Sequence, residues 1–467
     1  MSGNGTRIAG ISGLRGVVGD GLDPAVAVEF AAAYASECED GPIVLGHDGR
    51  VSARLFAAAV EAGVTATGHD VLYTGATATP TIGILVREFQ AAGGIQISAS
   101  HNPPKYNGLK FFQRAGMVLS QSQGRSMLDR WQRREFRWAS WESLGRARTI
   151  EDPDRRHLAS VLGIVDAQSI QRRGLKVVLD ACHGAGGRLG TALLQALGCR
   201  TLVLGGQPDG RYDHSPEPTE TNLSEFAAIV PAVGAAVGFF QDPDADRLAI
   251  VDETGRYIGE ELTLALAALR RLDHANGPVV LNLSTSRVTE DLARHRGCEV
   301  FRTPVGEINV VERMLAENAV LGGEGNGGVI DPRVGFVRDS FVGMAMILDL
   351  LAASAGPLSH LVDGLPRYAM VKDQYPLATG PDAGREARGG ATGVAALWDR
   401  IAAACPLARA DRRDGLRLDW DDRWVHVRAS NTEPIVRVIS EAAEPNLARE
   451  LAQRIGRWIG TPWEGPP

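Results

Sequence analysis

The sequence GGIQISASHNPPKYNGLK, residues 93–110, contains a short apolar strand followed by a polar loop with two consecutive prolines. Prolines cannot continue a helix or donate a hydrogen bond inside a central strand, so the chain must leave the strand in a rigid loop. This loop, which we call the serine loop, places a hydroxyl, an imidazole and an amide side by side in Ser100, His101 and Asn102. Because polar loops commonly carry function, Ser100 is a candidate nucleophile. A serine beside a histidine also suits a hydrolase, an alternative that the loop alone leaves open.

Short apolar strands and helices alternate around the serine loop. We expect strands at 42–45 and 95–98, an Ala-rich helix at 25–36, and a helix that begins at Ser52 and ends at Gly63. Asp and Ser side chains before these helices are suitable N-caps, and glycine commonly ends a helix. The alternation favours a parallel α/β architecture.

The same order of strand and helix returns twice, over residues 175–240 and 278–321. The segment after a junction at 366–376 differs, because it holds two runs that can pair as strands, 416–418 and 424–428, before a final helix. This pattern indicates a small α+β domain at the C-terminal end. Since 467 residues are too many for one core, we expect three or four domains.

The bulk composition excludes several classes of protein. The net charge of -7 and the pI of 5.9 argue against a general nucleic-acid binder. No run of 18 apolar residues occurs, so we expect no membrane span. The five cysteines are irregularly spaced without a CxxC pair, and the N-terminal residues lack an apolar signal segment. These features predict a cytoplasmic protein with reduced thiols.

Three aspartates alternate in QDPDADR, residues 241–247, directly after an apolar run. In such a tight loop Asp242, Asp244 and Asp246 can converge on one hard cation, and oxygen ligands suit Mg2+, Mn2+ or Ca2+. The aspartates also match ligand positions of a calcium EF-hand, but Arg247 stands where that loop needs glycine. A solvated acidic turn is a further alternative. We expect a catalytic divalent-metal site in this stretch, which we call the metal loop.

A glycine-rich stretch, GGEGNGG at residues 322–328, follows a later predicted strand at 319–321. Five glycines allow the backbone to approach a ligand closely. Glu324 and Asn326 offer acceptors and donors that can bind sugar hydroxyls. The alternative is a flexible glycine turn without a ligand.

A fourth loop, RASNTEP at residues 428–434, is followed closely by Arg437. Two arginines, two hydroxyls and an amide within ten residues can hold a phosphate dianion. The alternative is a surface turn with a charged rim.

Three cationic residues are weaker candidates. Arg15 lies in a glycine-rich loop, Arg50 follows a predicted strand, and Lys110 comes ten residues after Ser100. Such residues are usually solvated, but a desolvated lysine can act as a base.

These four loops, in this order, resemble those of the α-D-phosphohexomutase superfamily, which includes phosphoglucomutase, phosphomannomutase and phosphoglucosamine mutase. The resemblance covers essentially the whole chain. It implies an α/β fold with four domains around a central cleft, three of similar α/β design with mixed sheets and a smaller C-terminal α+β domain. The expected domains, each with one of the four loops, are 1–155, 156–256, 257–367 and 368–467.

The resemblance also implies roles for individual residues. Ser100 matches the phosphoserine that carries the phosphate, and it joins Asp242, Asp244 and Asp246 as a metal ligand. The other expected catalytic residues are Arg15, His101 and Lys110. The expected substrate-binding residues are Arg247, Glu324, Asn326, Arg428, Ser430, Asn431, Thr432 and Arg437.

One departure concerns proton transfer. Gly328 stands where many members of the superfamily have a histidine with a proton-transfer or phosphate-binding role. The resemblance therefore leaves the general acid or base unassigned.

The implied reaction is the reversible interconversion of 1- and 6-phosphates of a hexose through phosphoserine and a bisphosphate. Glucosamine 6-phosphate is the substrate that we favour, with mannose and glucose phosphates as alternatives. Mg2+ is the expected cofactor, hexose 1,6-bisphosphate the expected activator, and the protein is expected to be a monomer or homodimer. A metal-dependent sugar phosphatase and a non-catalytic sugar-phosphate sensor are the other classes considered.

Overall fold

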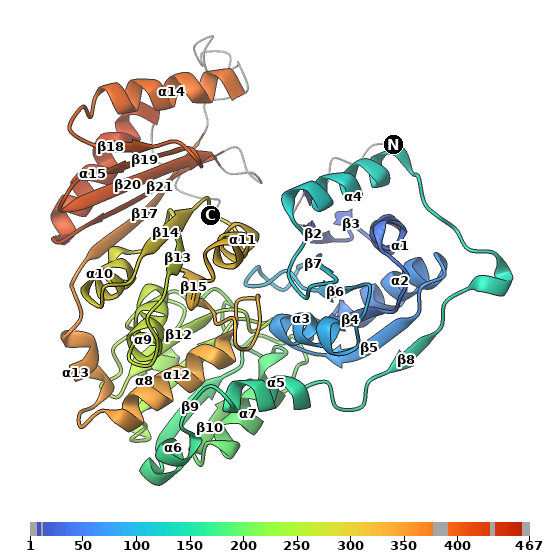
Figure 1. Cartoon of the computed structure of the whole chain (residues 1–467), viewed down its shortest axis with the longest axis horizontal. Helices are drawn as coiled ribbons and strands as arrows, with labels where there is room; N and C mark the ends of the chain where they lie inside the picture. The colour runs from blue at the N-terminus through green and yellow to red at the C-terminus, as the bar shows by residue number, and fades with distance from the viewer. Residues whose placement is uncertain (1–6, 11–12, 377–390, 430–434, 460–467) are drawn as a thin grey trace.

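The computed structural model describes residues 7–10, 13–376, 391–429 and 435–459. These parts of the chain form four β-sheets, of eight, four, four and five strands in chain order, with helices packed against them. In Figure 1 the first sheet (blue) lies on the right, the second and third (green to yellow) at the lower left, and the fourth (orange to red) at the upper left. The expected α/β architecture is confirmed.

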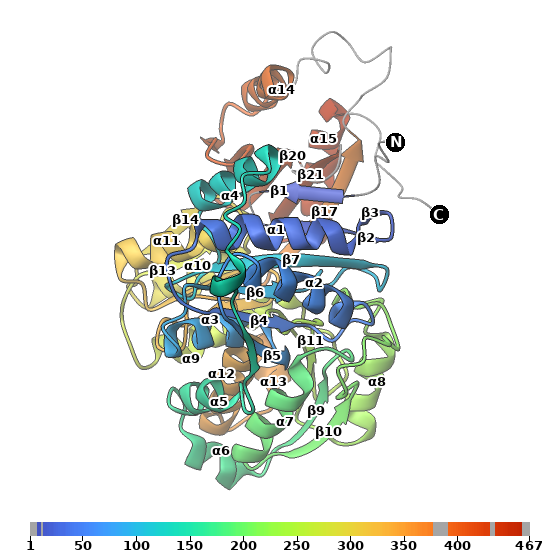
Figure 2. The ribbon, with the colours of Figure 1, turned by 90° about the vertical axis from the view of Figure 1, so that its right-hand side faces the viewer.

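Four neighbouring strands form the centre of the eight-stranded first sheet, in the order β5-β4-β6-β7. Strands β4, β5 and β6 are parallel, and β7 is antiparallel to β6. Figure 2 shows this sheet and its helices nearest the viewer. Its strands are β1 (Arg7–Gly10), β2 (Gly13–Val18), β3 (Gly21–Leu22), β4 (Ile43–His47), β5 (Val71–Ala76), β6 (Gly93–Ile97), β7 (Tyr106–Gln113) and β8 (Ala147–Thr149). The helices are α1 (Pro24–Glu37), α2 (Ala53–Thr65), α3 (Thr79–Glu88), α4 (Gln121–Arg133) and the 3-10 turn η1 (Trp141–Ser143).

The second and third sheets repeat this four-strand order, as β10-β9-β11-β12 and β14-β13-β15-β16. In each, the first three strands are parallel and the last is antiparallel. The strands are β9 (Lys176–Asp180), β10 (Arg200–Leu204), β11 (Val237–Gln241), β12 (Leu248–Asp252), β13 (Val279–Asn282), β14 (Val300–Thr303), β15 (Leu321–Glu324) and β16 (Gly328–Ile330). The helices are α5 (Arg155–Leu162), α6 (Ala167–Arg173), α7 (Gly186–Ala196), α8 (Ser224–Ala232), α9 (Glu260–Leu272), α10 (Arg287–His295), α11 (Glu307–Glu317), α12 (Ser340–Ala353) and α13 (Leu358–Asp363).

Each of these three units carries a candidate loop at the same topological place. The serine loop joins β6 to β7, the metal loop joins β11 to β12, and the turn at 325–327 within the glycine-rich stretch joins β15 to β16. In all three, the loop leaves the carboxyl end of a parallel strand and returns as an antiparallel strand. In α/β sheets this end is where ligands bind.

The fourth sheet is antiparallel throughout, in the order β17-β21-β20-β19-β18. Its elements are β17 (Ala369–Pro376), α14 (Ala391–Ala403), β18 (Arg409–Asp411), β19 (Leu416–Asp419), β20 (Arg423–Ala429), β21 (Ile435–Ala442) and α15 (Pro445–Ile459). Its apolar core, which includes Trp398, Val427 and Ile455, is separate from the others.

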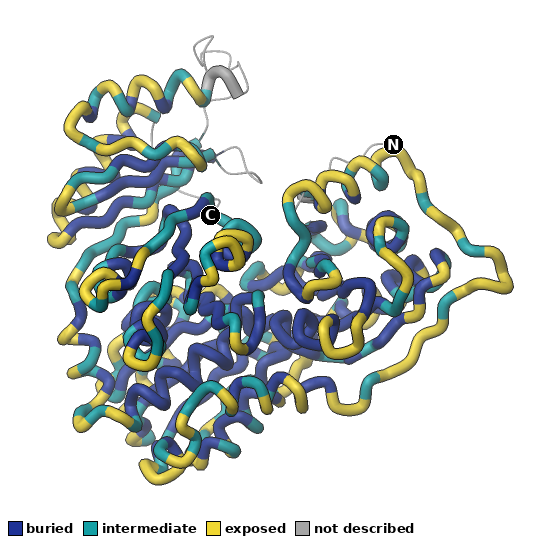
Figure 3. The backbone as a smooth tube through the Cα atoms, in the orientation of Figure 1, coloured by how far each residue is buried: buried dark blue, intermediate teal, exposed yellow. Residues whose placement is uncertain are grey.

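The second and third sheets share one apolar core. Leu179 of β9, Leu281 of β13 and Phe341 of α12 belong to the same buried cluster. In Figure 3 the buried backbone (dark blue) is concentrated in the sheets and the helices between them. The metal loop and the glycine-rich stretch are therefore held on a common scaffold.

One expected helix end is wrong. Helix α2 continues past Gly63 to Thr65, and Ser52 makes no side-chain cap. A Cβ atom at Gly63 would lie 2.5 Å from the carbonyl oxygen of Val28, so this glycine allows α1 and α2 to approach closely. The hydroxyl of Ser52 instead accepts a hydrogen bond from Asn107 at 2.9 Å.

Candidate active site

The backbone of Ser100 adopts a left-handed conformation, with φ of +50°. This conformation is strained for a residue with a side chain and costs on the order of 1–3 kcal/mol. The Ser100 amide donates to the hydroxyl of Ser98 at 2.8 Å, and that hydroxyl donates to Asp48 at 2.8 Å. The neighbouring structure therefore holds the buried Ser100 in a fixed orientation.

The guanidinium of Arg50 binds the backbone of the serine loop. It donates over 2.5 to 3.0 Å to four backbone carbonyls, those of Ser100, Asn102, Pro103 and Tyr106. Its Nε pairs with Asp48 at 2.9 Å. Arg50 was only a weak candidate from the sequence, because nothing local indicates that its partners lie about 50 residues ahead.

The metal loop lies directly against the serine loop. The hydroxyl of Ser100 donates to Oδ2 of Asp242 at 2.7 Å. The other oxygen of Asp242 accepts from the backbone amides of Asp246 and Arg247 at 3.2 and 3.1 Å, which closes the loop. Thr79 at the start of α3 donates to Asp244 at 2.5 Å.

The three aspartates could hold a metal ion. Asp242, Asp244 and Asp246 are completely buried, and each offers an oxygen within 4.8 Å of the others. Oδ1 of Asp244 and Oδ1 of Asp246 have no hydrogen-bond partner in the described structure. Burial, followed by the charges of the other two aspartates, raises the pKa of Asp242 well above its usual value. Buried oxygens without partners are costly, and a divalent cation satisfies such a set.

Lys110 reaches the same carboxylates from β7. Its Nζ lies 2.5 Å from Oδ2 of Asp244 and 2.9 Å from Oδ2 of Asp246. Burial opposes the charged form of the lysine, but the two carboxylates outweigh it and raise its pKa. Lys110 therefore carries a proton in this arrangement and is not a free base.

Arg15 and His101 complete the surroundings of Ser100. Nη1 of Arg15 donates to the side chain of Asn102 at 2.7 Å. Nδ1 of His101 lies 3.3 Å from the hydroxyl of Ser100. The charge of Arg247, then burial and the charge of Arg15, lower the pKa of His101 well below its usual value, so its imidazole is neutral at neutral pH.

The glycine-rich stretch is a hairpin more than a loop, which corrects the expectation from the sequence. Gly322, Gly323 and Glu324 belong to β15, and only residues 325–327 form the turn. Glu324 is buried and accepts hydrogen bonds from Asn282 at 2.8 Å and from the amide of Gly306 at 3.1 Å. We call β15, β16 and this turn the sugar hairpin.

Arg338 connects the metal loop to the sugar hairpin. Its Nη2 donates to Asp246 at 2.7 Å and its Nη1 donates to Glu324 at 2.8 Å, while Nε lies 3.5 Å from Glu307. Ion pairs between buried partners and bidentate guanidinium contacts fix geometry strongly. Nothing in the sequence around Arg338 indicates this role, because its partners come from distant strands.

Arg428 and Arg437 lie opposite each other on β20 and β21. Side chains of directly opposed residues share one face, and like charges placed so repel. Burial lowers the pKa of Arg428, against the opposing charge of Asp414. The candidate residues between them, Ser430, Asn431 and Thr432, lie outside the described residues.

Of the candidate residues, the structure brings together Ser100, His101, Arg15, Lys110, Arg247 and the three aspartates. Glu324 joins this group through Arg338. The side chain of Asn326 accepts from the amide of Gly328 at 3.3 Å and so stabilises the turn of the sugar hairpin. In the described parts of the chain, we find no helix that is long and apolar enough to cross a membrane.

Comparison with protein families finds four consecutive matches. The phosphoglucomutase/phosphomannomutase alpha/beta/alpha domains I, II and III match residues 6–138, 155–255 and 259–368. The C-terminal domain of the same family matches residues 387–457.

Two archaeal relatives align along nearly the whole chain. A "Phosphoglucomutase/phosphomannomutase" of Thermococcus kodakarensis is 36% identical over 454 residues, which cover 96% of this chain and 97% of the relative. A "Probable phosphoglucosamine mutase" of Methanopyrus kandleri is 34% identical over 446 residues, 95% of each chain.

Solved structures share the fold. A phosphoglucomutase/phosphomannomutase family protein of Burkholderia thailandensis superimposes with a TM-score of 0.82 at 26% identity over 96% of both chains. The N-acetylphosphoglucosamine mutase of Aspergillus fumigatus, solved with GlcNAc-6P and magnesium, has a TM-score of 0.53 at 15% identity over 94% of this chain and 99% of its own.

Proposed function

The chain belongs to the phosphoglucomutase/phosphomannomutase family of α-D-phosphohexomutases, and we propose that it interconverts hexose 1- and 6-phosphates with Ser100 as its phosphate carrier. The observation that carries this proposal is the contact between the hydroxyl of Ser100 and Asp242, at 2.7 Å within the three-aspartate cluster. A serine esterified at this position brings about -1.5 to -2 charges, which a cation beside it offsets.

The reaction proceeds in two transfers. The phosphoryl group of phospho-Ser100 passes to the free hydroxyl of a hexose monophosphate, which gives a hexose bisphosphate and the free serine. After the sugar turns in the cleft, Ser100 attacks the phosphate at the other end and the hexose isomer is released. His101 is neutral and lies 3.3 Å from the serine hydroxyl, so it can take the proton of Ser100 in the second step.

The metal loop serves both transfers. We assign Mg2+ to Asp242, Asp244 and Asp246, with the Ser100 oxygen as a further ligand. When bound, the cation neutralises charge that develops on the moving phosphoryl group. The ammonium of Lys110 adds a second positive charge beside Asp244 and Asp246 and can return a proton to the leaving oxygen.

The remaining residues bind the substrate. Arg428 and Arg437, with Ser430, Asn431 and Thr432, hold the phosphate that is not reacting. Glu324 and Asn326 of the sugar hairpin contact the sugar hydroxyls. Arg247, the last residue of the metal loop, binds the reacting phosphate. Its charge lowers the pKa of His101, which places the guanidinium near Ser100.

The substrate that we assign is glucosamine 6-phosphate, converted to glucosamine 1-phosphate, with mannose and glucose phosphates as alternatives. The name of the Methanopyrus kandleri relative supports the first and that of the Thermococcus kodakarensis relative the second. Hexose 1,6-bisphosphate is the activator that restores phospho-Ser100. A cytoplasmic location agrees with the free cysteines of the described chain. The domain boundaries near 155, 256 and 367 and a monomeric or homodimeric state belong to the same proposal.

A side-by-side turnover assay tests this function. The purified protein is given glucosamine 6-phosphate, mannose 1-phosphate or glucose 1-phosphate, with Mg2+ and a trace of the matching bisphosphate. We expect isomerisation that Ser100→Ala abolishes and that Ser122→Ala, on the exposed start of α4, leaves unchanged. Steady release of inorganic phosphate without isomerisation would show a phosphatase instead, and near-normal turnover of the Ser100→Ala variant would overturn the carrier role.

A further inference from the structure

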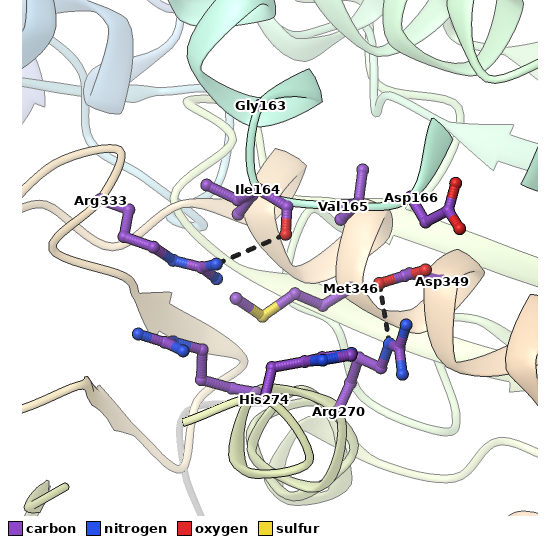
Figure 4. Close-up of a pocket in the computed structure, with 10 residues that line it drawn as sticks. Gly163, Ile164, Val165, Asp166, Arg270, His274, Arg333, Met346 and Asp349 are labelled. Carbon is purple, nitrogen blue, oxygen red and sulfur yellow. Dashed lines mark hydrogen bonds and ion pairs between the residues drawn. The ribbon is translucent and has the colours of Figure 1, made fainter. Parts of the chain in front are cut away.

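A cavity of about 320 Å³ lies away from Ser100, between the turn that joins α5 to α6 and the helices α9 and α12. Figure 4 shows its residues: Ile164 and Val165 of the turn line one side, Arg270 and His274 line the other, and Arg333 reaches the carbonyl oxygen of Ile164. We call this space the basic cavity. Its volume is at the lower end of the range for small-molecule sites.

Three arginines line the basic cavity, Arg270, Arg271 and Arg333, together with the carboxylates of Asp166 and Asp349. Arg271 and Arg333 share a single carboxylate, with Nε of Arg271 3.5 Å and Nη2 of Arg333 2.7 Å from Oδ2 of Asp331. The side chain of Arg271 is only 10% exposed. Burial, and then the charge of Arg333, lower the pKa of Arg271.

Arg271 also has unused donors. Its Nε donates to the carbonyl oxygen of Val320 at 3.3 Å, and its two terminal nitrogens donate to no residue of the described chain. Arg270, in contrast, is matched by Asp349 at 2.7 Å. A largely enclosed guanidinium with free donors beside a second guanidinium can hold an oxyanion, because two adjacent arginines match its geometry and charge.

A second observation points to a ligand with hydroxyl groups. Oδ1 of Asp349, which also lines the basic cavity, is buried and has no hydrogen-bond partner in the described structure. Such an acceptor is costly unless a donor reaches it. We propose that the basic cavity binds a small phosphate monoester of a polyol, with its phosphate on Arg271 and Arg333 and a hydroxyl toward Asp349.

The site is connected to the sugar hairpin. Val320, which Arg271 contacts, directly precedes β15, and Asp331, which Arg271 and Arg333 share, directly follows β16. A phosphate that draws the two guanidiniums toward the cavity weakens their contacts with Val320 and Asp331, at the two ends of this hairpin. The ligand thereby changes how Glu324 at the end of β15 is presented, a consequence that rests on the proposed function.

Direct binding on the full-length protein tests the site without any assay of turnover. Inorganic phosphate and glycerol 3-phosphate are titrated by calorimetry into the wild type, Arg271→Met, Arg333→Met and the control Arg313→Met on α11. Because phosphate also binds the proposed active site, Arg428→Met is measured in parallel. We expect Arg271→Met and Arg333→Met to lose one class of sites by at least about tenfold in affinity, and Arg428→Met to lose the other.

Arg333 is partly exposed, with 37% of its side chain accessible, so its variant is expected to fold even if Arg271→Met does not. Wild-type binding by a folded Arg333→Met variant would overturn the site. An equal loss in Arg313→Met would also overturn it, because the effect would then be one of general charge.

The connection to the hairpin has its own measurement. Saturating glycerol 3-phosphate also competes at the proposed active site, so the KM for the hexose phosphate rises in both the wild type and Arg333→Met. The connection predicts that the change in KM differs between the two proteins, with kcat unchanged in both. Binding in the cavity with the same change in KM in both proteins would refute the connection and leave the cavity site intact. If no hexose phosphate is turned over, the calorimetric result still decides the site, so failure of the proposed function is distinguishable.

Discussion

A Cβ atom on Gly328 would lie 2.3 Å from Cδ of Arg338. The absence of a side chain at position 328 therefore creates the space through which Arg338 reaches Asp246 and Glu324. The histidine that many relatives are expected to carry here is incompatible with this path of the arginine. The side chain of the buried Arg338 thus occupies the space that a side chain at position 328 would fill.

The first prediction follows from this packing. In Gly328→Ala the new methyl group displaces Arg338 without removing its charge, so both ion pairs lengthen. We expect kcat/KM to fall about 10- to 100-fold, because misplacing a positioning group is costly. The measurement is steady-state turnover. Gly356→Ala, whose Cβ meets only ordinary contacts at 3.4 Å or more, is the control and should retain full activity.

The second prediction concerns Arg338 itself. Arg338→Met leaves Asp246 and Glu324 without their shared partner, and we expect a larger loss of turnover than in Glu324→Gln. Arg338→Lys keeps the charge but cannot contact both carboxylates in a forked geometry, so it should restore only part of the activity. In a double-mutant cycle with Glu324→Gln the two losses should not add. Additive losses would argue against a connection through Arg338.

The third prediction addresses Arg50 and the shape of the serine loop. Arg50→Lys cannot satisfy four carbonyls at once, so buried acceptors lose their donors at about 1–3 kcal/mol each. We expect a lower midpoint of urea denaturation and a sharp loss of turnover. Arg54→Lys, on the exposed side of α2, should behave as wild type. Normal turnover of Arg50→Lys would mean that Ser100 keeps its conformation without the four hydrogen bonds from Arg50.

The fourth prediction concerns metal removal. A ligand that binds only the folded protein adds RT ln(1 + [L]/Kd), about 2.7 kcal/mol at 100 times Kd. Mg2+ should therefore raise the thermal midpoint of the wild type, and a chelator should reverse the rise. Asp244→Asn should respond much less, whereas Asp399→Asn on the exposed face of α14 should respond fully. An equal shift in Asp244→Asn would place the cation elsewhere.

The fifth prediction is a pH dependence at the contact between the third and fourth sheets. His426 of β20 lies 2.8 Å from the hydroxyl of Ser284 and 2.6 Å from the carbonyl oxygen of Asp414. Burial lowers its pKa to about 4. Because the unfolded chain binds a proton near pH 6.5 and the folded chain does not, stability is complete above this value and falls between about 6.5 and 4, by up to about 3 kcal/mol.

The measurement compares denaturant unfolding at pH 7.5 and 4.5 in the wild type and in His426→Gln. Glutamine does not titrate, so the variant should lose less stability over this interval. The same slope in both proteins would show that other groups account for the pH dependence.

Local sequence indicated candidate residues on each loop, and the structure brings those of the serine loop and the metal loop together. Two prolines end β6 with a polar loop, and alternate aspartates follow β11, because strand ends and turn chemistry depend on neighbouring residues. The superfamily followed from the order of four such loops. The same local reasoning ended α2 at Gly63 and assigned residues 322–324 of β15 to a loop. Glycine also serves close packing, as the approach of Val28 to Gly63 demonstrates.

Only the tertiary structure decided which groups meet. Ser100 and Asp242 are 142 residues apart, and Asp246 and Arg338 are 92 apart. These contacts form because the first three sheets have the same strand order although their sequences differ. They also depend on the apolar core that the second and third sheets share with α12. Arg50 and Arg338 read locally as ordinary arginines. In the folded protein both guanidiniums pair with carboxylates or carbonyls from distant parts of the chain, because a buried charge without a partner is costly.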